Sequence, residues 1–438
     1  MSGLELALAV ALLLAVTAPG LASIAAGLWF STRGVRPGER FVVRATAVGL
    51  FLSFLASAAT ALLASGWIGS GYVGELDLGS WLRVGGYEVP AVFLFDRVAL
   101  AFSLLAAAIT ALVAQFSRRY LHREPGFLRF FVLLGMFASG TQLVAFAGAL
   151  DVMFAGWELM GISSALFIGF FLERPEPLRS SVRAFATYRL CDAGFLLAIV
   201  STHELLGSTR LAALEAAPLL APSAATAIAS LFLLSALGKS AQLPFSGWLA
   251  RAIEGPTPSS ALFYGSVSIH TGLFLLLRVW PLLEVAPLVR WVGIALGLAT
   301  ALYATAIARV HADAKGVLAH ATLAQVGLIL AEICAGWIEL ALLHLVGHAL
   351  LRVWQYLRAP NAIHDAHRTG RERARAPWLT RLSPRLALRL YGATIHRFRL
   401  DERVDACLAP LLALVRKLDG WEQRYRRRLS LDREEEPR

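Results

Sequence analysis

The chain alternates long apolar segments with short polar connections, and this pattern predicts its architecture. About eleven segments contain the roughly 20 apolar residues that a helix needs to cross a bilayer. They lie near residues 4–30, 41–65, 94–117, 128–148, 150–172, 183–202, 224–246, 258–280, 287–309, 316–335 and 337–357. We therefore expect an all-α polytopic membrane domain over residues 1–357. Its first segment follows no basic stretch and is long enough to span, which predicts a retained helix.

The stretch 66–96 interrupts this pattern between the second and third spans. It contains Gly-rich turns and short apolar runs that alternate with polar residues (LDLGSWLRVGGYEVPAVFLFD). Alternation with a period of two is typical of strands, and glycine permits tight turns between them. The sequence therefore predicts a short β-hairpin outside the membrane.

The seventh apolar segment is interrupted in its second half, directly after Lys239. Pro244 removes a backbone hydrogen bond and Gly247 loosens the next turn, while Gly255 and Pro256 end the segment. Broken helices at membrane depth are tolerated where their backbone lines a cavity, and they mark transport sites. We expect the seventh helix to be broken.

Residues 358–438 differ in character from the rest of the chain. They carry most of its positive charge and two apolar stretches, 386–391 and 406–415, that are too short to span. This composition predicts amphipathic helices at the cytoplasmic membrane surface. Such a tail serves either as a solvated anchor or as a docking surface for a partner.

Basic residues gather in alternate loops, which predicts the orientation of the chain because positive loops remain inside. We therefore expect a multi-pass protein of the cell (inner) membrane with its N-terminus outside and its tail in the cytoplasm. The basic loops contain Arg33, Arg36, Arg40, Arg118, Arg119, Arg123, Arg174, Arg179, Arg309 and Lys315, and the opposite loops contain Glu75, Asp77, Glu88, Asp151 and Glu204.

Composition agrees with a membrane protein and excludes several functions. The chain is 57% hydrophobic and only 16% charged, whereas a soluble domain is about 25% charged. Its net charge of +11 lies in loops and tail, so no nucleic acid is predicted as a partner. The 3 cysteines lack metal-type spacing and predict neither disulfides nor zinc. No nucleotide, flavin or iron–sulfur motif is present, so we expect no cofactor in this chain.

Glu158 and Lys239 lie inside apolar segments long enough to span. A charge at bilayer depth costs about 2.5–3.5 kcal/mol on insertion scales, so it is retained where it faces a protein interior or a water path. Structural pairing would explain Glu158, and a proton relay is the functional alternative. The sixth span offers Arg183, Arg189 and Asp192 as partners for its carboxylate.

Histidine adds further titratable groups within the predicted spans. The eighth span contains Tyr264 and His270 with serines at 266 and 268, a polar strip that predicts either a satisfied core or a water-bearing path. His320 lies in the tenth span, above the loop residues Asp313 and Lys315. Because its pKa lies near physiological pH, histidine suits proton transfer.

The eleventh span carries His344, His348 and Arg352 at a spacing of four, which places them on one helix face. Two histidines at this spacing bind a metal only with further ligands, and the sequence specifies none. We therefore predict a polar proton path through the bundle rather than a metal site.

Several motifs together resemble one family. They are YLHREPGFLRFFVLLGMF, FAGWELMGISSALFIGFF, GKSAQLPFSGWLARAIEGPTPSS, DAKGVLAHATLAQVG and HLVGHALLRVWQ, in this order over residues 93–365. They resemble the proton-conducting, antiporter-like membrane subunits of NuoL type in respiratory NADH dehydrogenase and the large subunit of Mrp sodium/proton antiporters. The resemblance implies that Glu158 and Lys239 form an ion-pair switch.

The chain departs from that family in two respects. The family's histidine in the eighth span falls on Tyr264, while His270 follows one and a half turns later. NuoL-type chains also continue through a second broken helix and a long lateral helix, which we do not expect here.

A branch of the family resembles this chain further, through FYGSVSIHTGLFLLLR, VWQYLRAPNAIHD and LYGATIHRFRLDERVDACLAPLLALVRKLDGWEQRY. These stretches resemble DabB, the membrane subunit of the DAB inorganic-carbon accumulation complex. The resemblance implies that H⁺ or Na⁺ flow through this chain drives CO₂ hydration or bicarbonate uptake by DabA. This partner is a large zinc protein, related to β-carbonic anhydrases, on the cytoplasmic side.

Three functions compete. The chain is a cation-conducting transporter subunit of a DAB-type complex, a pumping subunit of a respiratory oxidoreductase or Mrp antiporter, or a non-conducting scaffold that docks a partner. The expected length of the C-terminal half disfavours the second function. The buried charges disfavour the third, because a scaffold has no use for them. In the first, any catalysis belongs to the partner and none to this chain.

Overall fold

A computed structural model describes residues 2–34, 37–66, 71–311, 313–359 and 383–404, together with residues 406, 413, 417 and 421. The chain divides into two compact units, Met1–Arg375 and Ala376–Arg438. Among the described residues, 11 helices are long and apolar enough to cross a membrane. This confirms the predicted all-α polytopic architecture.

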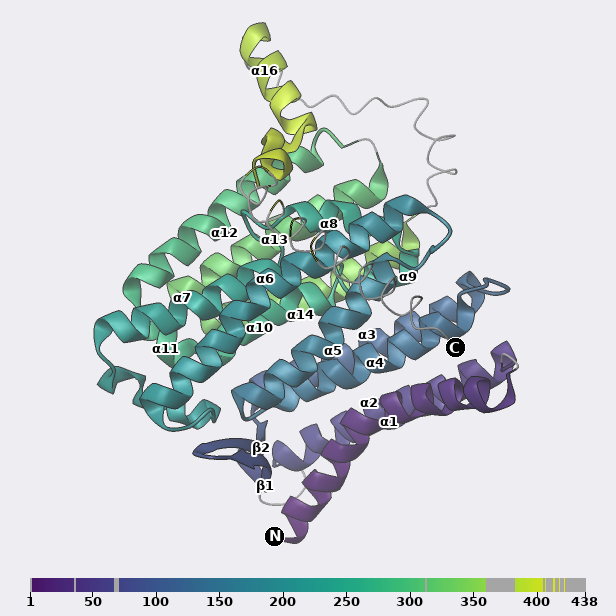
Figure 1. The fold of residues 1–438 in the computed structure, drawn as a ribbon, viewed down its shortest axis with the longest axis vertical. Helices are drawn as coiled ribbons and strands as arrows, with labels where there is room; N and C mark the ends of the chain where they lie inside the picture. The colour runs from purple at the N-terminus through teal and green to yellow at the C-terminus, as the bar shows by residue number, and fades with distance from the viewer. Residues whose placement is uncertain are drawn as a thin grey trace, which may run out of the picture. The chain divides into compact units, whose positions relative to one another are not determined.

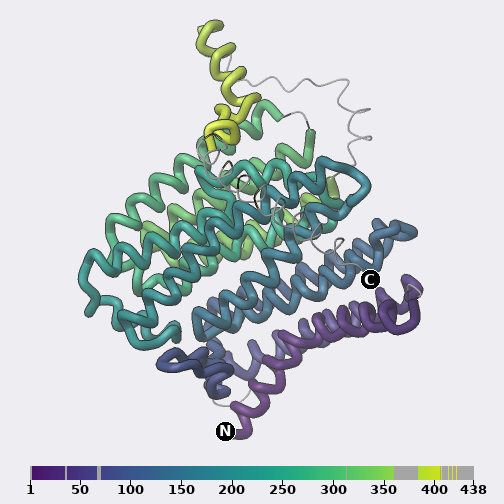
Figure 2. Tube along the Cα trace, in the orientation of Figure 1, coloured from purple at the N-terminus to yellow at the C-terminus, as the bar shows by residue number. Residues whose placement is uncertain are grey.

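The helices of the first unit lie side by side, with α1 and α2 against α4, and α12 against α13 (Figures 1 and 2). Its elements in chain order are α1 Gly3–Arg33, α2 Glu39–Ala64, β1 Gly74–Val84, β2 Tyr87–Phe95, α3 Arg97–Tyr120, α4 Phe127–Phe146, α5 Leu150–Ile168, α6 Pro175–Leu206, η1 Leu211–Leu219, α7 Pro222–Lys239, α8 Gly247–Arg251, η2 Ala252–Glu254, α9 Thr257–Leu262, α10 Val267–Arg278, α11 Trp280–Glu284, α12 Pro287–Ala308, α13 Ala314–Ala335 and α14 Ile338–Arg358.

The predicted hairpin is present as the antiparallel pair β1–β2. Its second strand is bonded to the turn between α4 and α5, where the Gly148 N–H donates to the Val92 carbonyl at 2.9 Å. Arg210, before η1, pairs with Asp77 of β1 at 2.6 Å. The backbone N–H of Gly79 and the Arg210 guanidinium hold the pKa of the Asp77 carboxyl below its usual value. The hairpin is thus fixed to one end of the helices.

The sixth and eighth predicted spans differ from the observed helices. The sixth begins at Pro175 rather than near 183, because proline suits the first helical position. Arg179 therefore lies on α6 and not in a loop. The eighth span is not continuous: α9 ends at Leu262 and α10 begins at Val267. Across this interruption the Ile269 N–H donates to the Phe263 carbonyl, six residues back.

The seventh span consists of α7, which ends at Lys239, and α8, which begins at Gly247. Two donors satisfy carbonyls at the end of α7: Trp248 Nε1 donates to the Gly238 carbonyl at 3.0 Å, and the Gln242 N–H donates to the Leu237 carbonyl at 2.8 Å. The freed carbonyls of a helix end need such partners in an apolar interior. The end of α7 is therefore stable inside the protein.

The second unit contains α16 (Pro384–Ile395) and η4 (Arg397–Arg399) among its described residues. Leu388, Tyr391 and Ile395 are exposed and lie three and four residues apart on α16, as in an amphipathic helix. Most of the predicted tail, including the stretch 407–412 and Cys407, lies outside the described residues. Its cytoplasmic location remains a prediction.

The helices α12 and α13 approach each other through glycine. A Cβ at Gly297 would lie 2.4 Å from the Gly327 carbonyl oxygen, and a Cβ at Gly327 would lie 2.5 Å from that of Gly297. Small residues allow such close backbone contact between membrane helices, where packing rather than the hydrophobic effect holds them together.

Gly297→Leu is therefore expected to lower the free energy of unfolding by about 1–3 kcal/mol or more, the cost of overpacking a close contact. Thermal unfolding of the purified protein in detergent measures this. The matched control is Ala295→Leu on the exposed side of α12, which is expected to unfold like the wild type. Equal loss in both variants would contradict the crossing.

Candidate functional site

Four predicted residues from three helices meet in one partly buried charged cluster. Arg189 of α6 forms ion pairs with Glu158 of α5 and, at 2.8 Å, with Asp192. Trp157 Nε1 donates to Asp192 Oδ1 at 2.5 Å. A guanidinium presents several donors in a fixed plane, so one arginine can serve two carboxylates. The charge of each carboxylate is thereby compensated inside the apolar interior.

Lys239, the fourth member, is only 1% exposed. Its Nζ donates to the Trp157 carbonyl at 3.0 Å and lies 4.7 Å from the centre of the Trp157 ring and 5.2 Å from that of Tyr188. Within the described part of the chain, no carboxylate oxygen lies within 4.0 Å of this ammonium group. Glu158 and Lys239 therefore share a cluster but are not a direct ion pair.

Local structure explains the position of Lys239. It is the last residue of α7, where the partial negative charge of the helix terminus favours a cation. Gly161 of α5 makes room for it: a Cβ there would lie 3.2 Å from Lys239 Nζ and 3.5 Å from Arg189 Nη2. The two cations thus face the same glycine, and the break after α7 positions the ammonium group.

A second group contains His270 of α10 with His348 and Arg352 of α14. His270 Nε2 lies 3.0 Å from His348 Nδ1, and Arg352 Nε donates to His348 Nε2 at 3.1 Å. His270 Nδ1 lies against the carbonyl of Ser266. All three side chains are buried, so the structure joins predicted residues from the eighth and eleventh spans.

His270, His348 and Arg352 form a hydrogen-bonded chain, called the histidine chain below. The proton positions on its two rings follow from the atoms that they contact. The Ser266 carbonyl only accepts, so His270 Nδ1 carries a proton; the Arg352 Nε–H only donates, so His348 Nε2 accepts. With both rings neutral, the remaining contact is then a donation from His348 Nδ1 to His270 Nε2. All three hydrogen bonds point from Arg352 towards Ser266, an arrangement suited to relaying a proton between the rings.

The predicted residues Tyr264 and His320 lie apart from these two groups. Tyr264, in the interruption before α10, packs edge-on against Tyr356 with ring centres 5.6 Å apart. His320 Nδ1 faces the carbonyl of Gly316 at 2.8 Å, and its ring lies 5.1 Å from that of His311. Both histidines lie at the beginning of α13, near Asp313.

The beginning of α13 is a capped helix terminus. Asp313 accepts the Gly316 N–H at 2.6 Å and pairs with His311 at 2.8 Å. Its hydrogen bond from His311 and the backbone N–H of Gly316 lower the pKa of this carboxyl to about 2. The carboxylate of Asp313 is thus paired with His311 at the beginning of α13.

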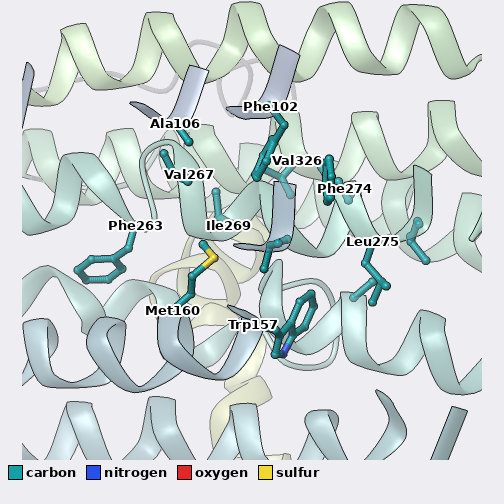
Figure 3. Packing of buried hydrophobic residues seen from close by; sticks show 14 of the residues in the cluster. Phe102, Ala106, Trp157, Met160, Phe263, Val267, Ile269, Phe274, Leu275 and Val326 are labelled. Carbon is teal, nitrogen blue, oxygen red and sulfur yellow. The ribbon is translucent and has the colours of Figure 1, made fainter. Parts of the chain in front are cut away.

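Apolar side chains of α3, α5, α10 and α13 pack together in one core. Figure 3 shows Trp157 and Met160 of α5 below Ile269 of α10, with Val326 of α13 and Phe102 of α3 on the far side. In the described part of the chain, the polar contacts between side chains of α5 and α10 are long, such as the 3.4 Å contact between the Ser164 and Ser268 hydroxyls. A proton that passes between the two groups therefore needs rearrangement or water.

Comparison with known proteins identifies the family to which this architecture belongs. The family model described as NADH:quinone oxidoreductase/Mrp antiporter, TM, matches residues 147–392, more than half of the chain, and includes both groups. The chain belongs to this family. A second model, NADH-Ubiquinone oxidoreductase (complex I), chain 5 N-terminus, matches residues 81–131.

Individual relatives agree with this membership. NADH-quinone oxidoreductase subunit L of Rhodobacter capsulatus is 32% identical over 311 residues, 67% of this chain and 44% of that protein. NADH-ubiquinone oxidoreductase chain 5 of Metridium senile is 35% identical over 271 residues, 62% of this chain and 45% of that protein. The chain thus spans less than half the length of these relatives.

Solved structures are similar as well. A chain of the Mrp complex from Dietzia sp. DQ12-45-1b superimposes with a TM-score of 0.66 and 27% identity, over 81% of this chain and 37% of that one. A chain of the membrane-bound sulfane sulfur reductase, an archaeal respiratory membrane complex, shares the fold. It superimposes with a TM-score of 0.68 at 18% identity, over 80% of this chain and 70% of that one. The antiporter-like resemblance seen in the sequence is confirmed.

The sequence reasoning did not propose three residues that the structure places in contact with the predicted ones. Trp157 contributes both its indole and its carbonyl to the cluster. Glu332 and Gln325 of α13 contact His344 of α14, at 2.9 Å and 3.0 Å. Glu332 carried a visible signal, because it is an acid within a predicted span. The partner of His344 could be found only once α13 and α14 were placed together.

Arg189→Met is expected to lower the free energy of unfolding by about 1–3 kcal/mol, less than the 3–5 kcal/mol of a fully buried pair because Arg189 is partly exposed. The reason is that two carboxylates lose their shared cation. Thermal unfolding in detergent measures the loss. Arg179→Met, at an exposed position of the same helix, is the matched control, and an equal melting temperature in both variants would refute the shared role.

Proposed function

We propose that this chain conducts protons across the membrane as an antiporter-like subunit of a larger respiratory or Mrp-type complex. One observation carries the proposal: Arg189 joins Glu158 and Asp192 in the apolar interior, while Lys239 lies beside them without a carboxylate partner of its own among the described residues. A structural ion-pair site has no need of a second, unpaired cation, since burying it is unfavourable.

The groups of the cluster differ in their ability to exchange protons. An arginine remains charged under all physiological conditions, whereas lysine and carboxylates change state when their surroundings change. Glu158 Oε1 is buried and has no hydrogen-bond partner in the described part of the chain, so it can accept a proton without first breaking a contact. Arg189 thus fixes the cluster, and Glu158 and Lys239 are its exchangeable members.

Protons suit these groups better than Na⁺. Hard cations such as Na⁺ are bound by several oxygen atoms, whereas the cluster offers two carboxylates already occupied by Arg189 and Trp157. Protonated Lys239 is a cation, and His270 and His348 become cations when both nitrogens of the ring are protonated. In these charged forms the three side chains repel metal cations. The hydrogen-bonded chain of His270, His348 and Arg352 supplies a continuation of the path towards α14.

Relatives support the type of complex. The curated relatives above are named as subunits of NADH–quinone oxidoreductases, and the Dietzia chain belongs to an Mrp complex. These findings favour a respiratory or Mrp-type assembly over inorganic-carbon accumulation. We therefore propose other membrane subunits as the principal partners.

Inorganic-carbon accumulation with a DabA-like zinc protein is the second candidate. It depends on the resemblance of residues 263–278, 353–365 and 390–425 to DabB, and much of the last two stretches lies outside the described residues. In that case the same cluster would drive CO₂ hydration or bicarbonate uptake by the partner, and no zinc would be held by this chain.

Glu158→Gln is expected to reduce ΔpH-driven proton flux at least about tenfold, because the amide keeps the shape of the side chain but cannot take up the proton. Flux is measured with a pH-sensitive dye in membrane vesicles of expressing cells, relative to vesicles without the chain. Glu173→Gln, at an exposed carboxylate beyond α5, is the control. Wild-type flux in Glu158→Gln would refute the proposal. Flux driven by a Na⁺ gradient instead would show that Na⁺, and not H⁺, is the conducted ion.

Purification of the full chain from its native membrane separates the two types of complex. We expect oxidoreductase or Mrp-type membrane subunits to accompany it, as identified by mass spectrometry, because the relatives assemble in such complexes. A stoichiometric, zinc-containing soluble protein would establish the second candidate. In that case Lys239→Ala should also abolish growth in air of cells that lack carbonic anhydrase.

A further inference from the structure

An acid–histidine pair lies near the connection between α13 and α14. Glu332, three residues before the end of α13, has its two carboxylate oxygens 2.9 and 3.1 Å from His344 Nδ1. Gln325 Oε1 lies 3.0 Å from His344 Nε2. The side chains of Glu332 and His344 are 16% and 24% exposed, so the group is partly buried yet accessible. The charged cluster and the histidine chain described above do not include Glu332.

This group lies at the end of the helices that carries the hairpin. Glu339 in the first turn of α14 pairs at 2.5 Å with Arg97, the first residue of α3, which follows β2 directly. Glu332 is about 4.5 Å along the axis from the end of α13, at 1.5 Å per residue. The neighbouring Trp337 is 60% exposed. Glu332 therefore lies within one turn of the surface on the hairpin side.

The same group continues inward to the histidine chain. His344 and His348 are one turn apart on α14, with ring centres 6.3 Å apart. His348 Nδ1 then contacts His270 Nε2 at 3.0 Å. Spacing of four residues places these rings on one helix face. A line of titratable groups thus runs from the surface at Glu332 through His344 and His348 to the buried His270.

The two ring nitrogens of His344 both lie against oxygen atoms. Both ring nitrogens face oxygen acceptors, Glu332 on one side and Gln325 on the other. Only the doubly protonated ring donates from both nitrogens. The positive ring beside the carboxylate forms a charge-assisted hydrogen bond. The arrangement therefore holds one transferable proton between an imidazole and a carboxylate.

We propose that Glu332 and His344 form a proton-transfer site at the hairpin-side mouth of the path, an inference that depends on the proposed proton conduction. A proton passes from His344 Nδ1 to a Glu332 oxygen: the N–H bond breaks, an O–H bond forms, and Nδ1 of the neutral ring is left able to take up another proton. The Glu332 carboxyl then releases its proton to water. The reverse sequence loads the path from the hairpin side.

A purely structural role makes a different prediction. If the contact only held the α13–α14 turn, glutamine at position 332 would preserve it, because its amide oxygen still accepts the hydrogen bond from His344. A proton-transfer role requires an acid. Glu332→Gln and Glu332→Asp therefore separate the two roles, since aspartate restores the acid on a shorter side chain.

The test measures proton flux in vesicles that contain the full chain with its native partners. We expect Glu332→Gln to reduce flux at least about fivefold and Glu332→Asp to recover part of it, because a positioned acid accelerates proton transfer by orders of magnitude. Glu339→Gln removes a matched carboxylate from the same turn, where it forms an exposed ion pair, and is expected to conduct like the wild type.

Two outcomes overturn the inference. Wild-type flux in Glu332→Gln does so directly, and if that variant is unstable, wild-type flux in His344→Gln does so from the other helix. Parallel measurement of Glu158→Gln separates the two levels of argument. Flux lost in Glu158→Gln but retained in Glu332→Gln refutes only this site, whereas a wild-type chain without proton flux refutes the proposed function and this inference with it.

Discussion

The shared ion pairs of Arg189 are the interaction on which the central arrangement depends. Two carboxylates and two cations at membrane depth are unfavourable singly, by about 2.5–3.5 kcal/mol each on insertion scales. Arg189 compensates Glu158 and Asp192 at once, and Trp157 supplies a further donor to Asp192. This requirement fixes the register of α5 against α6. It also leaves Lys239 as a cation held by a carbonyl and two aromatic rings rather than by a carboxylate.

Interrupted helices give the protein its polar interior. The end of α7 places Lys239 in the cluster, and the carbonyl of Ser266, in the interruption between α9 and α10, lies against His270 Nδ1. Ser240, directly after Lys239, donates its hydroxyl hydrogen to the Ile269 carbonyl of α10 at 2.7 Å, which bonds the end of α7 to the helix that carries His270. One peptide unit and one hydrogen bond thus separate Lys239 from α10.

The hairpin end of the helices carries a separate set of polar contacts. Asp96 caps α3 and pairs with Arg278 at the end of α10 at 2.6 Å, which ties the hairpin to the helix that carries His270. The Arg278 guanidinium and the backbone N–H groups of α3 outweigh burial and lower the pKa of the Asp96 carboxyl. Glu332 and His344 lie at the same end. The fold thus combines fixed ion pairs with one acid–histidine pair that can exchange a proton.

Local sequence determined the spans, the hairpin and the two most prominent charges. Run length decides whether a helix can cross a bilayer, and a lone charge within such a run is visible without any neighbour. Partner choice was decided only by the tertiary structure. Arg189, and not Lys239, pairs with Glu158 because pairing depends on which side chains of α5, α6 and α7 reach one point. The interruption before α10 lies beside Gly265, where a Cβ would come within 2.7 Å of the Tyr356 ring from α14, a contact that no local pattern encodes.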